Sequence, residues 1–534
     1  MDCKSTRLSY RQTGAFSKIA LDYVDRSEAL MSFAGHQPEP RGINAAIAAR
    51  KNFNTNRELL VAELKKQYKD IDTSSSVQKN IELLLSPETF TITTAHQNNI
   101  FTGPLYFIYK ILHAIRLADH LNSTQVSHRF VPVYYIGSED ADLDELNHFH
   151  LDNEKIEWKT KQTGAVGRMK VDKDFLKLID HIEGRLGVLP NGGDAVTLVR
   201  QAYQAGDDIQ TATFKIVNAL FSSYGLIVLL PDNAALKAQM MKVFEDDLVG
   251  QVASGIVGNT SARLGEIYKV QAHPRDINLF YLEGDIRERI ELRGDSYHVL
   301  NTKLNFSKDQ MLAQLREYPE RFSPNVILRG LYQETILPNI VFIGGGGELA
   351  YWLELKDLFD HYGTPFPVQV LRNSFLIIEN KLKEKIRKLG LTVEDIFKPG
   401  QQLVNELVTS HTDKKLQLNG VLSDTGLLYD TIKKQAGSID TTLEKHVEAL
   451  KTTTLHRLRE LEKKMLRAEK RKYSDQQKQV EAIRAKLFPG DGLQERHDNF
   501  LIYYAMWGPE FISCLYEHSL ALEQEFVVLE IGAN

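Results

Sequence analysis

The spacing of hydrophobic residues divides the chain into three stretches. Over residues 1–85 apolar positions recur at helical intervals, which predicts a helical N-terminal segment. Over residues 86–378 short apolar runs alternate with helical segments. Over residues 379–488 a charged sequence carries an apolar residue at every third or fourth position. The pattern therefore predicts a helical preface, an α/β core and a long helical region.

The middle stretch has the alternation that is typical of a Rossmann-like core. Because predicted strands and helices alternate along the chain, we expect a parallel sheet covered by helices on both faces. Two insertions, at about 155–205 and 256–320, are expected to interrupt this core. The first insertion includes 156–171, which we interpret as a hairpin, and the second has the short alternating runs of antiparallel strands. The predicted strands are 90–95, 130–137 and 226–232, the predicted helices are 104–122, 211–224 and 234–255, and the core resumes over 325–378.

The helical region is predicted to form a coiled coil that ends at Pro489-Gly490. Its apolar positions step mostly by three and four, but Val447 to Leu458 and Leu450 to Leu461 are eleven apart, so the supercoil should be weak or slightly right-handed. A helix of this length must bury its apolar side against its own chain or a second copy, and we expect both. The remaining residues, 489–534, are apolar again and should pack back on the core.

The amino-acid composition and charge of the chain exclude several classes of function. The chain has 534 residues, 43% of them hydrophobic, with a net charge of −5 and a pI near 6.4, so no overall positive field favours nucleic acid or anionic lipid. Apolar runs are too short for a membrane helix, and no signal peptide is evident, which predicts a cytoplasmic protein. Its two cysteines, Cys3 and Cys514, provide no disulfide framework or zinc site and are interpreted as incidental. Small ligands are the expected partners.

The first candidate for chemistry is the loop after the first core strand. Thr94, His96, Gln97, Asn98 and Thr102 supply polar groups where open α/β sheets bind ligands. The alternative is structural: Thr102 would cap the next helix, and His96 and Gln97 would satisfy loop backbone groups.

The second candidate follows the next core strand, in 137-GSEDADLDELNHFHL-151. Its carboxylates, with Asn147 and His148, could bind a divalent metal or a substrate amine. The spacing matches no recognised metal code, and acidic residues also favour the first turn of a helix. We therefore expect substrate binding and no metal.

The third candidate is 341-VFIGGGGELAYW-352. Gly345, Gly347 and Ala350 satisfy G-x-G-x-x-A between a predicted strand and helix, but Arg372 and Asn373 stand where an NAD site needs an acid. The glycines would admit a ligand close to the backbone, or serve only helix-to-strand packing. No Walker A, G-x-S-x-G or H-E-x-x-H motif occurs.

Five ordered segments together resemble a known family, the bacillithiol biosynthesis cysteine-adding enzymes (BshC). They are 94-TAHQNNIFTGPLYFIYKILHAIRLA-118, 131-VPVYYIGSEDADLDELNH-148, 273-HPRDINLFYL-282, 344-GGGGELAYWLELK-356 and 489-PGDGLQER-496. The resemblance implies a Rossmann-type core related to class I aminoacyl-tRNA synthetases, two inserted connecting regions, and a C-terminal coiled coil that supports a homodimer. It also implies addition of cysteine to the amine of glucosaminyl-malate, the last step of bacillithiol synthesis.

The chain departs from the family pattern at one wall of the expected site. Members commonly carry T-G-Q-Q where this chain has 94-TAHQ-97, so His96 replaces a glutamine. The synthetase H-I-G-H and K-M-S-K-S signatures are also absent. Use of ATP or ADP is thus an expectation by analogy of fold.

Amide synthesis needs an activated acyl group, an unprotonated amine and stabilisation of developing charge. We expect catalytic roles for His96, Glu139 and Asp140. The expected substrate-binding residues are Thr94, Gln97, Asn98, Thr102, Gly103, Tyr106, Asp142, Asn147, His148, Gly345, Gly346, Gly347, Glu348 and Trp352. The expected nucleotide-binding residues are Arg372, Asn373, Ser374, Gln494 and Arg496. Two alternatives remain: a non-catalytic scaffold on a synthetase-like core, and a nucleotide-dependent ligase for another amino sugar.

Overall fold

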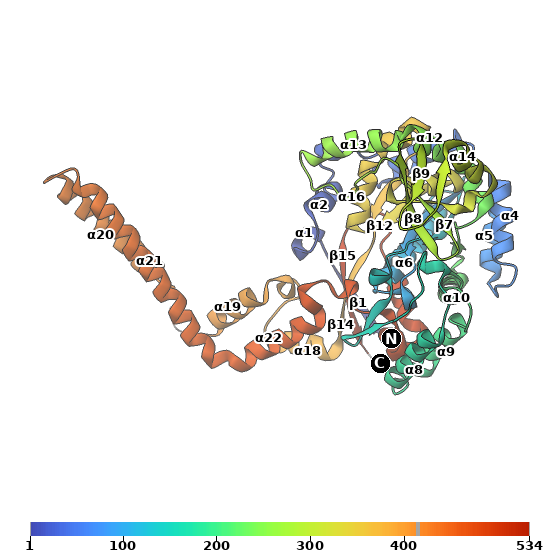
Figure 1. Ribbon diagram of the computed structural model, residues 1–534. Coiled ribbons are helices and arrows are strands. Elements are labelled where there is room, and N and C mark those ends of the chain that lie inside the picture. Colours follow the sequence, from blue (N-terminus) through green and yellow to red (C-terminus); the bar gives the residue numbers. More distant parts are fainter. Residues whose placement is uncertain (1, 413–416, 533–534) are drawn as a thin grey trace. The chain divides into compact units, whose positions relative to one another are not determined.

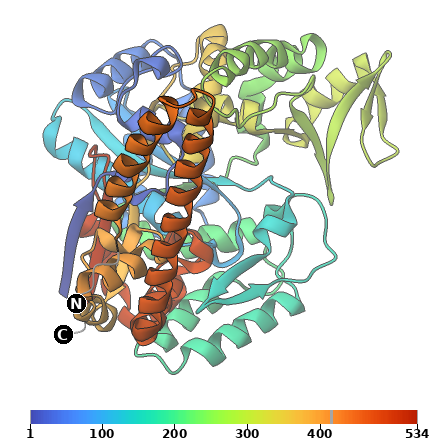
Figure 2. The same ribbon diagram turned by 90° about the vertical axis from the view of Figure 1, so that its left-hand side faces the viewer.

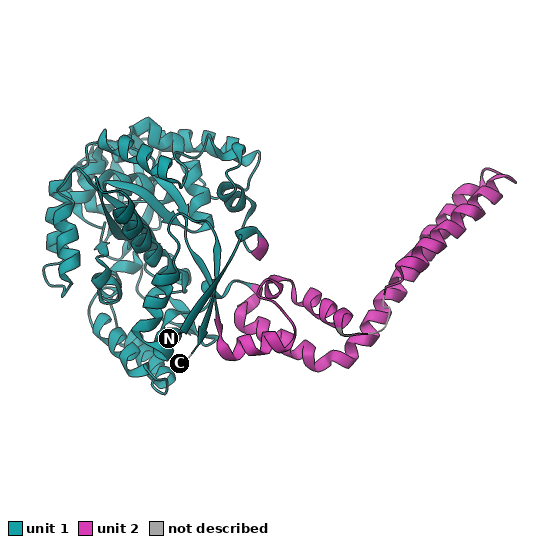
Figure 3. Cartoon of the chain, turned by 180° about the vertical axis from the view of Figure 1, so that it is seen from behind, with its two compact units in different colours: residues 1–11, 15–377, 492–534 teal, residues 12–14, 378–491 magenta. Residues whose placement is uncertain are grey.

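The computed structural model describes residues 2–412 and 417–532. These form two compact units (Figure 3). The first comprises residues 1–11, 15–377 and 492–534, and the second comprises 12–14 and 378–491.

A five-stranded parallel sheet forms the centre of the first unit, in the order β13-β12-β2-β3-β6 (Figure 1). Its strands are buried along most of their length because helices cover both faces, and their apolar residues are joined by buried threonines in β2 and a buried glutamine in β13. The strands are β2 (Thr89–Gln97), β3 (Arg129–Gly137), β6 (Ile227–Leu229), β12 (Asn339–Gly344) and β13 (Val368–Leu371). The predicted Rossmann-like parallel core is confirmed.

Helices connect these strands, and most lie within a turn of their predicted positions. The predicted helix at 234–255 is broken, because Gln251 adopts a left-handed φ of 50° between two helices. The helices are α6 (Tyr106–Thr124), α10 (Ile209–Phe221), α11 (Ala234–Lys237), α12 (Met241–Gly250), α13 (Val252–Gly265), α15 (Val326–Ile336), α16 (Gly346–Glu354) and α17 (Lys356–Tyr362).

The N-terminal stretch is not wholly helical as predicted. It begins with strand β1 (Asp2–Leu8), which pairs antiparallel with β15 (Phe526–Gly532) in a small sheet completed by β14 (Ser374–Glu379). The expectation that both cysteines are incidental is also wrong, since Cys3 and Cys514 form a disulfide. The main helices of this stretch are α2 (Lys18–Val24), α3 (Pro40–Lys51), α4 (Arg57–Gln67) and α5 (Ser75–Leu83).

The first insertion contains a hairpin, but not at the predicted residues 156–171. The hairpin is β4 (His148–Leu151) with β5 (Glu154–Glu157), and it turns at Asp152 and Asn153, which both have positive φ. Aspartate and asparagine tolerate this conformation best among residues other than glycine, so the turn forms there. Helices α8 (Lys173–Leu186) and α9 (Gly192–Ala202) complete the insertion.

The second insertion is antiparallel, as the alternating pattern predicts. Its sheet has the order β10-β9-β8-β7-β11. The elements are β7 (Leu279–Glu283), β8 (Ile286–Arg293), β9 (Ser296–Val299), β10 (Asn305–Ser307), α14 (Lys308–Glu317) and β11 (Phe322–Pro324).

The second unit is helical. In it α20 (Asn419–Gly437) and α21 (Leu443–Lys470) lie side by side, joined by a short turn (Figures 1 and 2). Ion pairs between Asp430 and Lys451 and between Lys433 and Glu448 link them, so the coiled coil folds against its own chain. The remaining helices are α18 (Asn380–Lys388), α19 (Gly400–His411) and α22 (Ser474–Leu487).

The segment after this unit returns to the first one. Asn499 Nδ2 donates to the carbonyl oxygens of Phe101 and Gly103, and α23 (Phe500–Trp507) and α24 (Pro509–His518) follow. Within the described residues, no helix is both long enough and apolar enough to cross a membrane.

Candidate active site

A cavity of about 540 Å³ lies where the first unit's parallel strands end. We call it the central cavity. Eleven of the residues singled out from the sequence line it: His96, Gln97, Tyr106, Asp140, Asp142, Gly345, Gly346, Gly347, Glu348, Arg372 and Arg496. Segments from all three predicted loops thus meet here, because parallel strands present their carboxyl ends at one edge of a sheet.

The other predicted site residues lie outside this lining: Thr94, Asn98, Thr102, Gly103, Glu139, Asn147, His148, Trp352, Asn373, Ser374 and Gln494. Most have structural partners. Thr94 Oγ1 donates to the carbonyl of Ile343, Trp352 stacks on Phe342, and Gln494 pairs with the backbone of Ile377. Asn373 Nδ2 donates to the carbonyl of Leu520, and Ser374 Oγ donates to Glu495. These side chains support the walls of the cavity.

The Thr102–Gly103 turn is not the start of a helix. Helix α6 begins at Tyr106, and Phe101, Thr102 and Gly103 all have positive φ. Asn499 donates to the carbonyl groups of this turn. The turn is therefore packed against the C-terminal segment, and Thr102 neither caps α6 nor faces the cavity.

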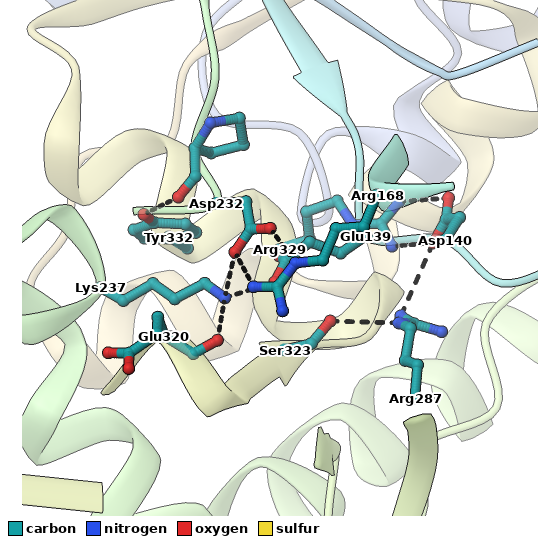
Figure 4. Close-up of polar contacts among 11 residues, drawn as sticks. Glu139, Asp140, Arg168, Asp232, Lys237, Arg287, Glu320, Ser323, Arg329 and Tyr332 are labelled. Atoms are coloured by element: carbon teal, nitrogen blue, oxygen red, sulfur yellow. Dashed lines mark hydrogen bonds and ion pairs between the residues drawn. The ribbon is translucent and has the colours of Figure 1, made fainter. Parts of the chain in front are cut away.

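Asp140 and Glu139 are neighbours that point to different partners (Figure 4). Asp140 receives two hydrogen bonds from Arg329, one of them 3.0 Å from Nη1 to Oδ2, and Arg287 Nη2 lies 3.7 Å from its Oδ1. Burial opposes ionisation of Asp140, but these two arginines outweigh it and hold its pKa below the usual range. Asp140 is thus an ionised partner of two arginines and a poor proton acceptor.

Glu139 is turned away from the cavity, into a buried group of charges. Its carboxylate pairs with Lys237, which also reaches Asp232, and Arg168 binds Asp232 through two bonds of 2.7 and 2.8 Å. Burial raises the pKa of Glu139, and the charge of Lys237 opposes that shift. We call Glu139, Arg168, Asp232 and Lys237 the Lys237 cluster (Figure 4).

Arg287 and Arg329, which we call the arginine pair, are lining residues that the sequence did not identify as site residues. Arg287 Nε donates to Ser323 Oγ at 3.2 Å, and its guanidinium lies 3.9 Å from the centre of the Phe280 ring. Arg329 comes from the first turn of α15. Arg287 stands in a noticeably basic strand, but nothing in the local sequence distinguishes Arg329, which only the tertiary fold brings to the cavity.

The glycine-rich turn is stabilised by Glu348. The amide of Gly345, the N-cap residue of α16, donates to Glu348 Oε2 at 2.8 Å. Lys110 on α6 holds the same carboxylate, with Nζ 2.9 and 2.6 Å from its two oxygens. The Glu348 side chain is still 26% exposed, so it contacts the cavity while its orientation is fixed.

His96 is neutral in this structure. Burial, together with the positive charges of Lys110 and Arg372, lowers its pKa well below the ordinary value. Its ring packs edge-on against Tyr106 and Phe107. Here His96 is an uncharged wall of the cavity and can accept a proton only transiently.

Arg372 and Arg496 differ although both line the cavity. The buried Arg372 guanidinium forms two bonds, of 3.1 and 2.7 Å, with Glu495 and lies over the Tyr106 ring. Arg496 is exposed at the rim. Arg496 is thus available to a ligand, whereas Arg372 is largely occupied.

Across the described part of the chain, no group of three or more His, Cys, Asp or Glu side chains is placed to hold a metal ion.

Comparison with known proteins supplies the family. Residues 1–373 match the N-terminal Rossmann-like domain of bacillithiol biosynthesis BshC, and residues 375–531 match its C-terminal coiled-coil domain. The chain is 39% identical to the "Putative cysteine ligase BshC" of Flavobacterium johnsoniae over 98% of this chain and 99% of that one. The protein of the same name from Cytophaga hutchinsonii is 37% identical over 93% of each chain, and that from Salinibacter ruber is 30% identical over 95% of each.

A solved structure described as a putative arginyl-tRNA synthetase from Campylobacter jejuni is also similar, with 9% identity and a TM-score of 0.22 over 88% of this chain and 98% of that one. A similarity at that level supports no conclusion about fold or function. The two family matches together span nearly the whole chain, and both match proteins of one kind. The chain belongs to the BshC family of bacillithiol biosynthesis.

Proposed function

We propose that the protein joins the carboxyl group of cysteine to the amine of glucosaminyl-malate. The names of its relatives support a cysteine ligase, and the family description supports bacillithiol biosynthesis. The acceptor and the use of a nucleotide rest on the resemblance and on the chemistry of the central cavity.

The observation that carries the proposal is the excess positive charge of the arginine pair. Arg287 and Arg329 share one carboxylate, that of Asp140, so one positive charge is not balanced there. Guanidinium groups bind carboxylates by paired, charge-assisted hydrogen bonds. The malate part of the proposed acceptor carries carboxylates, which suit this side of the cavity.

Other carboxylates that line the cavity suit an amine. Glu348 contacts the cavity with its orientation fixed by Lys110, and Asp142 lies exposed at the edge. Either carboxylate can hold an ammonium group and accept its proton before the amine attacks. His96, a neutral lining residue, can take the same proton.

We propose that ATP activates the cysteine carboxylate. A free carboxylate and an amine do not condense readily in water, so the carboxylate oxygen would first attack ATP. Attack at the γ-phosphorus forms an acyl phosphate and releases ADP, whereas attack at the α-phosphorus forms an acyl adenylate and releases pyrophosphate. The amine then attacks the acyl carbon, the phosphate or AMP leaves, and the amine loses a proton. Arg496 and the Gly346–Gly347 backbone are the lining groups that suit phosphate oxygens.

The test is product formation by purified protein supplied with ATP, cysteine and glucosaminyl-malate, followed by mass spectrometry and nucleotide analysis. We expect the amide together with equimolar AMP or ADP. Product without nucleotide cleavage would remove ATP from the scheme. Amide formed only with other amino sugars would indicate a different acceptor, and no product with any amine would favour a binding or scaffold protein.

We also propose that the protein is a homodimer that associates through α20 and α21. Both helices expose large apolar side chains that their own pairing leaves uncovered, among them Leu427, Leu428, Leu450 and Leu461. Several large apolar side chains exposed on one helical hairpin favour an interaction surface, and two-fold homodimers are the commonest assemblies.

A further inference from the structure

The Lys237 cluster lies behind the central cavity and takes no part in the proposed chemistry. The Lys237 side chain is fully buried, and its ammonium group has three acceptors. These are the Glu139 carboxylate, Asp232 Oδ1 at 3.2 Å and the carbonyl oxygen of Glu320 at 3.0 Å. An ammonium group has three donors, so all its hydrogen-bonding capacity is used.

Two of these three contacts lead to the arginine pair. Glu139 is followed in the chain by Asp140, which accepts two hydrogen bonds from Arg329. Glu320 precedes β11, whose Ser323 accepts the hydrogen bond from Arg287 Nε. Lys237 therefore joins the two backbone segments that orient Arg329 and Arg287, as Figure 4 shows.

The charges of the two groups differ. The Lys237 cluster contains two cations and two carboxylates and is balanced, whereas Asp140 with the arginine pair carries one unbalanced positive charge. The buried cluster thus adds no net charge beside the cavity. Its contribution to an anion site would be geometric: it fixes where the two guanidinium groups are held.

We propose that Lys237 is a positioning residue for an oxyanion site formed by Arg287 and Arg329. The inference rests on the proposed function and extends it to a residue that does not contact substrate. The oxyanion is a carboxylate of the acceptor or a phosphoryl oxygen of the nucleotide. Both offer oxygens in the geometry that paired guanidinium groups recognise.

The test compares binding and turnover in two variants. Lys237→Met removes the ammonium group but leaves two carboxylates facing Arg168 alone, which endangers folding. The double variant Lys237→Met with Glu139→Gln leaves the balanced Arg168–Asp232 pair intact and is expected to fold. Calorimetry with glucosaminyl-malate, L-malate and ATP measures affinity without requiring turnover.

We expect the double variant to bind one class of oxyanion about tenfold or more weakly, with the KM for cysteine changed less than about twofold. Loss confined to glucosaminyl-malate and L-malate identifies a carboxylate, and loss confined to ATP identifies a phosphoryl group. The matched control, Lys215→Met with Asp207→Asn, removes a partly buried ion pair that lies outside the cavity lining and on elements that do not carry the arginine pair, and it should leave all three affinities unchanged.

Unchanged affinities in the double variant, or an equal loss for every ligand and for kcat, would overturn the inference. A wild-type protein that binds these ligands but forms no amide would instead contradict the proposed function. Because binding is measured directly, the two failures are distinguishable.

Discussion

At the scale of single residues, the site depends on how two adjacent carboxylates divide their roles. Asp140 faces the cavity and holds the arginine pair, while Glu139 faces the buried Lys237 cluster. The sequence shows both as acidic residues after a strand and assigns both to catalysis. Only their partners, which come from distant segments, separate the two roles.

Asp140→Asn tests whether Asp140 positions arginines or accepts protons. We expect kcat to fall less than about tenfold with the pH–rate profile unchanged, since a lost general base costs about 10²- to 10⁴-fold. The free energy of unfolding should fall by about 1.5–3 kcal/mol, because Arg329 loses a charged hydrogen-bond partner. Steady-state kinetics across pH and urea denaturation measure both. A thousandfold loss of kcat that removes one limb of the profile would assign Asp140 as the base.

The buried His113 should make the free energy of unfolding depend on pH. The Asn373 amide donates to Nδ1 at 3.0 Å, so Nε2 carries the proton and donates to the carbonyl of Ala521 at 2.7 Å. Burial lowers the pKa of His113 to about 4. In the unfolded chain His113 binds a proton below about pH 6.5, whereas in the folded protein it binds one only near pH 4. The free energy of unfolding therefore falls as pH decreases through this window.

The expected loss is about 3 kcal/mol between pH 6.5 and 4, at about 1.4 kcal/mol for each unit of pKa difference. His113→Gln, which cannot titrate, should show a smaller decrease over the same window in urea denaturation at several pH values. A variant and wild type with parallel pH dependence would show that His113 does not control it.

The sequence was sufficient to locate about half of the residues that line the central cavity, because polar residues at strand ends are a local signal. It placed His96, Asp140, Glu348 and Arg496 at the cavity. It could not locate Arg329 or Lys237, since neither belongs to a motif. The role of each depends on a contact with a carboxylate more than ninety positions away in the chain. It also assigned Asn373 and Gln494 to ligand binding, although both bond to neighbouring backbone.

At the scale of elements, regular strands and helices were predictable and turns were not. The central strands are short segments rich in β-branched and aromatic residues that alternate with helical segments, so the sequence pattern identifies them. The first hairpin was misplaced because its turn depends on two residues with positive φ, Asp152 and Asn153, rather than on a glycine. The small sheet of β1, β14 and β15 was missed, because it pairs the two ends of the chain.

The turn before α6 gives a test at this scale. Gly103 has a φ of 62° and a ψ of −139°, and a Cβ there would lie 2.7 Å from Asn99 Cβ. Gly103→Ala should therefore reduce the free energy of unfolding by about 1–3 kcal/mol, as expected for a side chain forced into this conformation. Thermal or urea denaturation measures the change.

Gly184→Ala is the matched control, because Gly184 lies inside α8 with nothing within 4 Å of the added carbon. That change should stabilise the protein by about 0.5–1 kcal/mol. Equal effects of the two substitutions would show that the turn at Gly103 is not strained in the way described.

At the scale of the whole molecule, the proposed homodimer accounts for the apolar surface of the helical unit. Leu427→Glu with Leu461→Glu places two charges on that surface, and we expect the dimer to become a monomer in light scattering with unchanged helix content. Val126→Glu with Val188→Glu, on apolar positions of the other unit that are even more exposed, should leave the mass unchanged. A monomeric wild-type protein at micromolar concentration would contradict the proposal.

The central claim is that the arginine pair of the central cavity holds the acceptor while cysteine is joined to it. The most direct measurement is the rate of amide formation by wild type, Arg329→Met and the exposed control Arg200→Met, with ATP and with glucosaminyl-malate below its KM. We predict product from wild type and the control, and a rate about 10- to 100-fold lower for Arg329→Met, as expected for loss of a charged hydrogen-bond pair. An undiminished rate in Arg329→Met, or no product from wild type, would contradict the account.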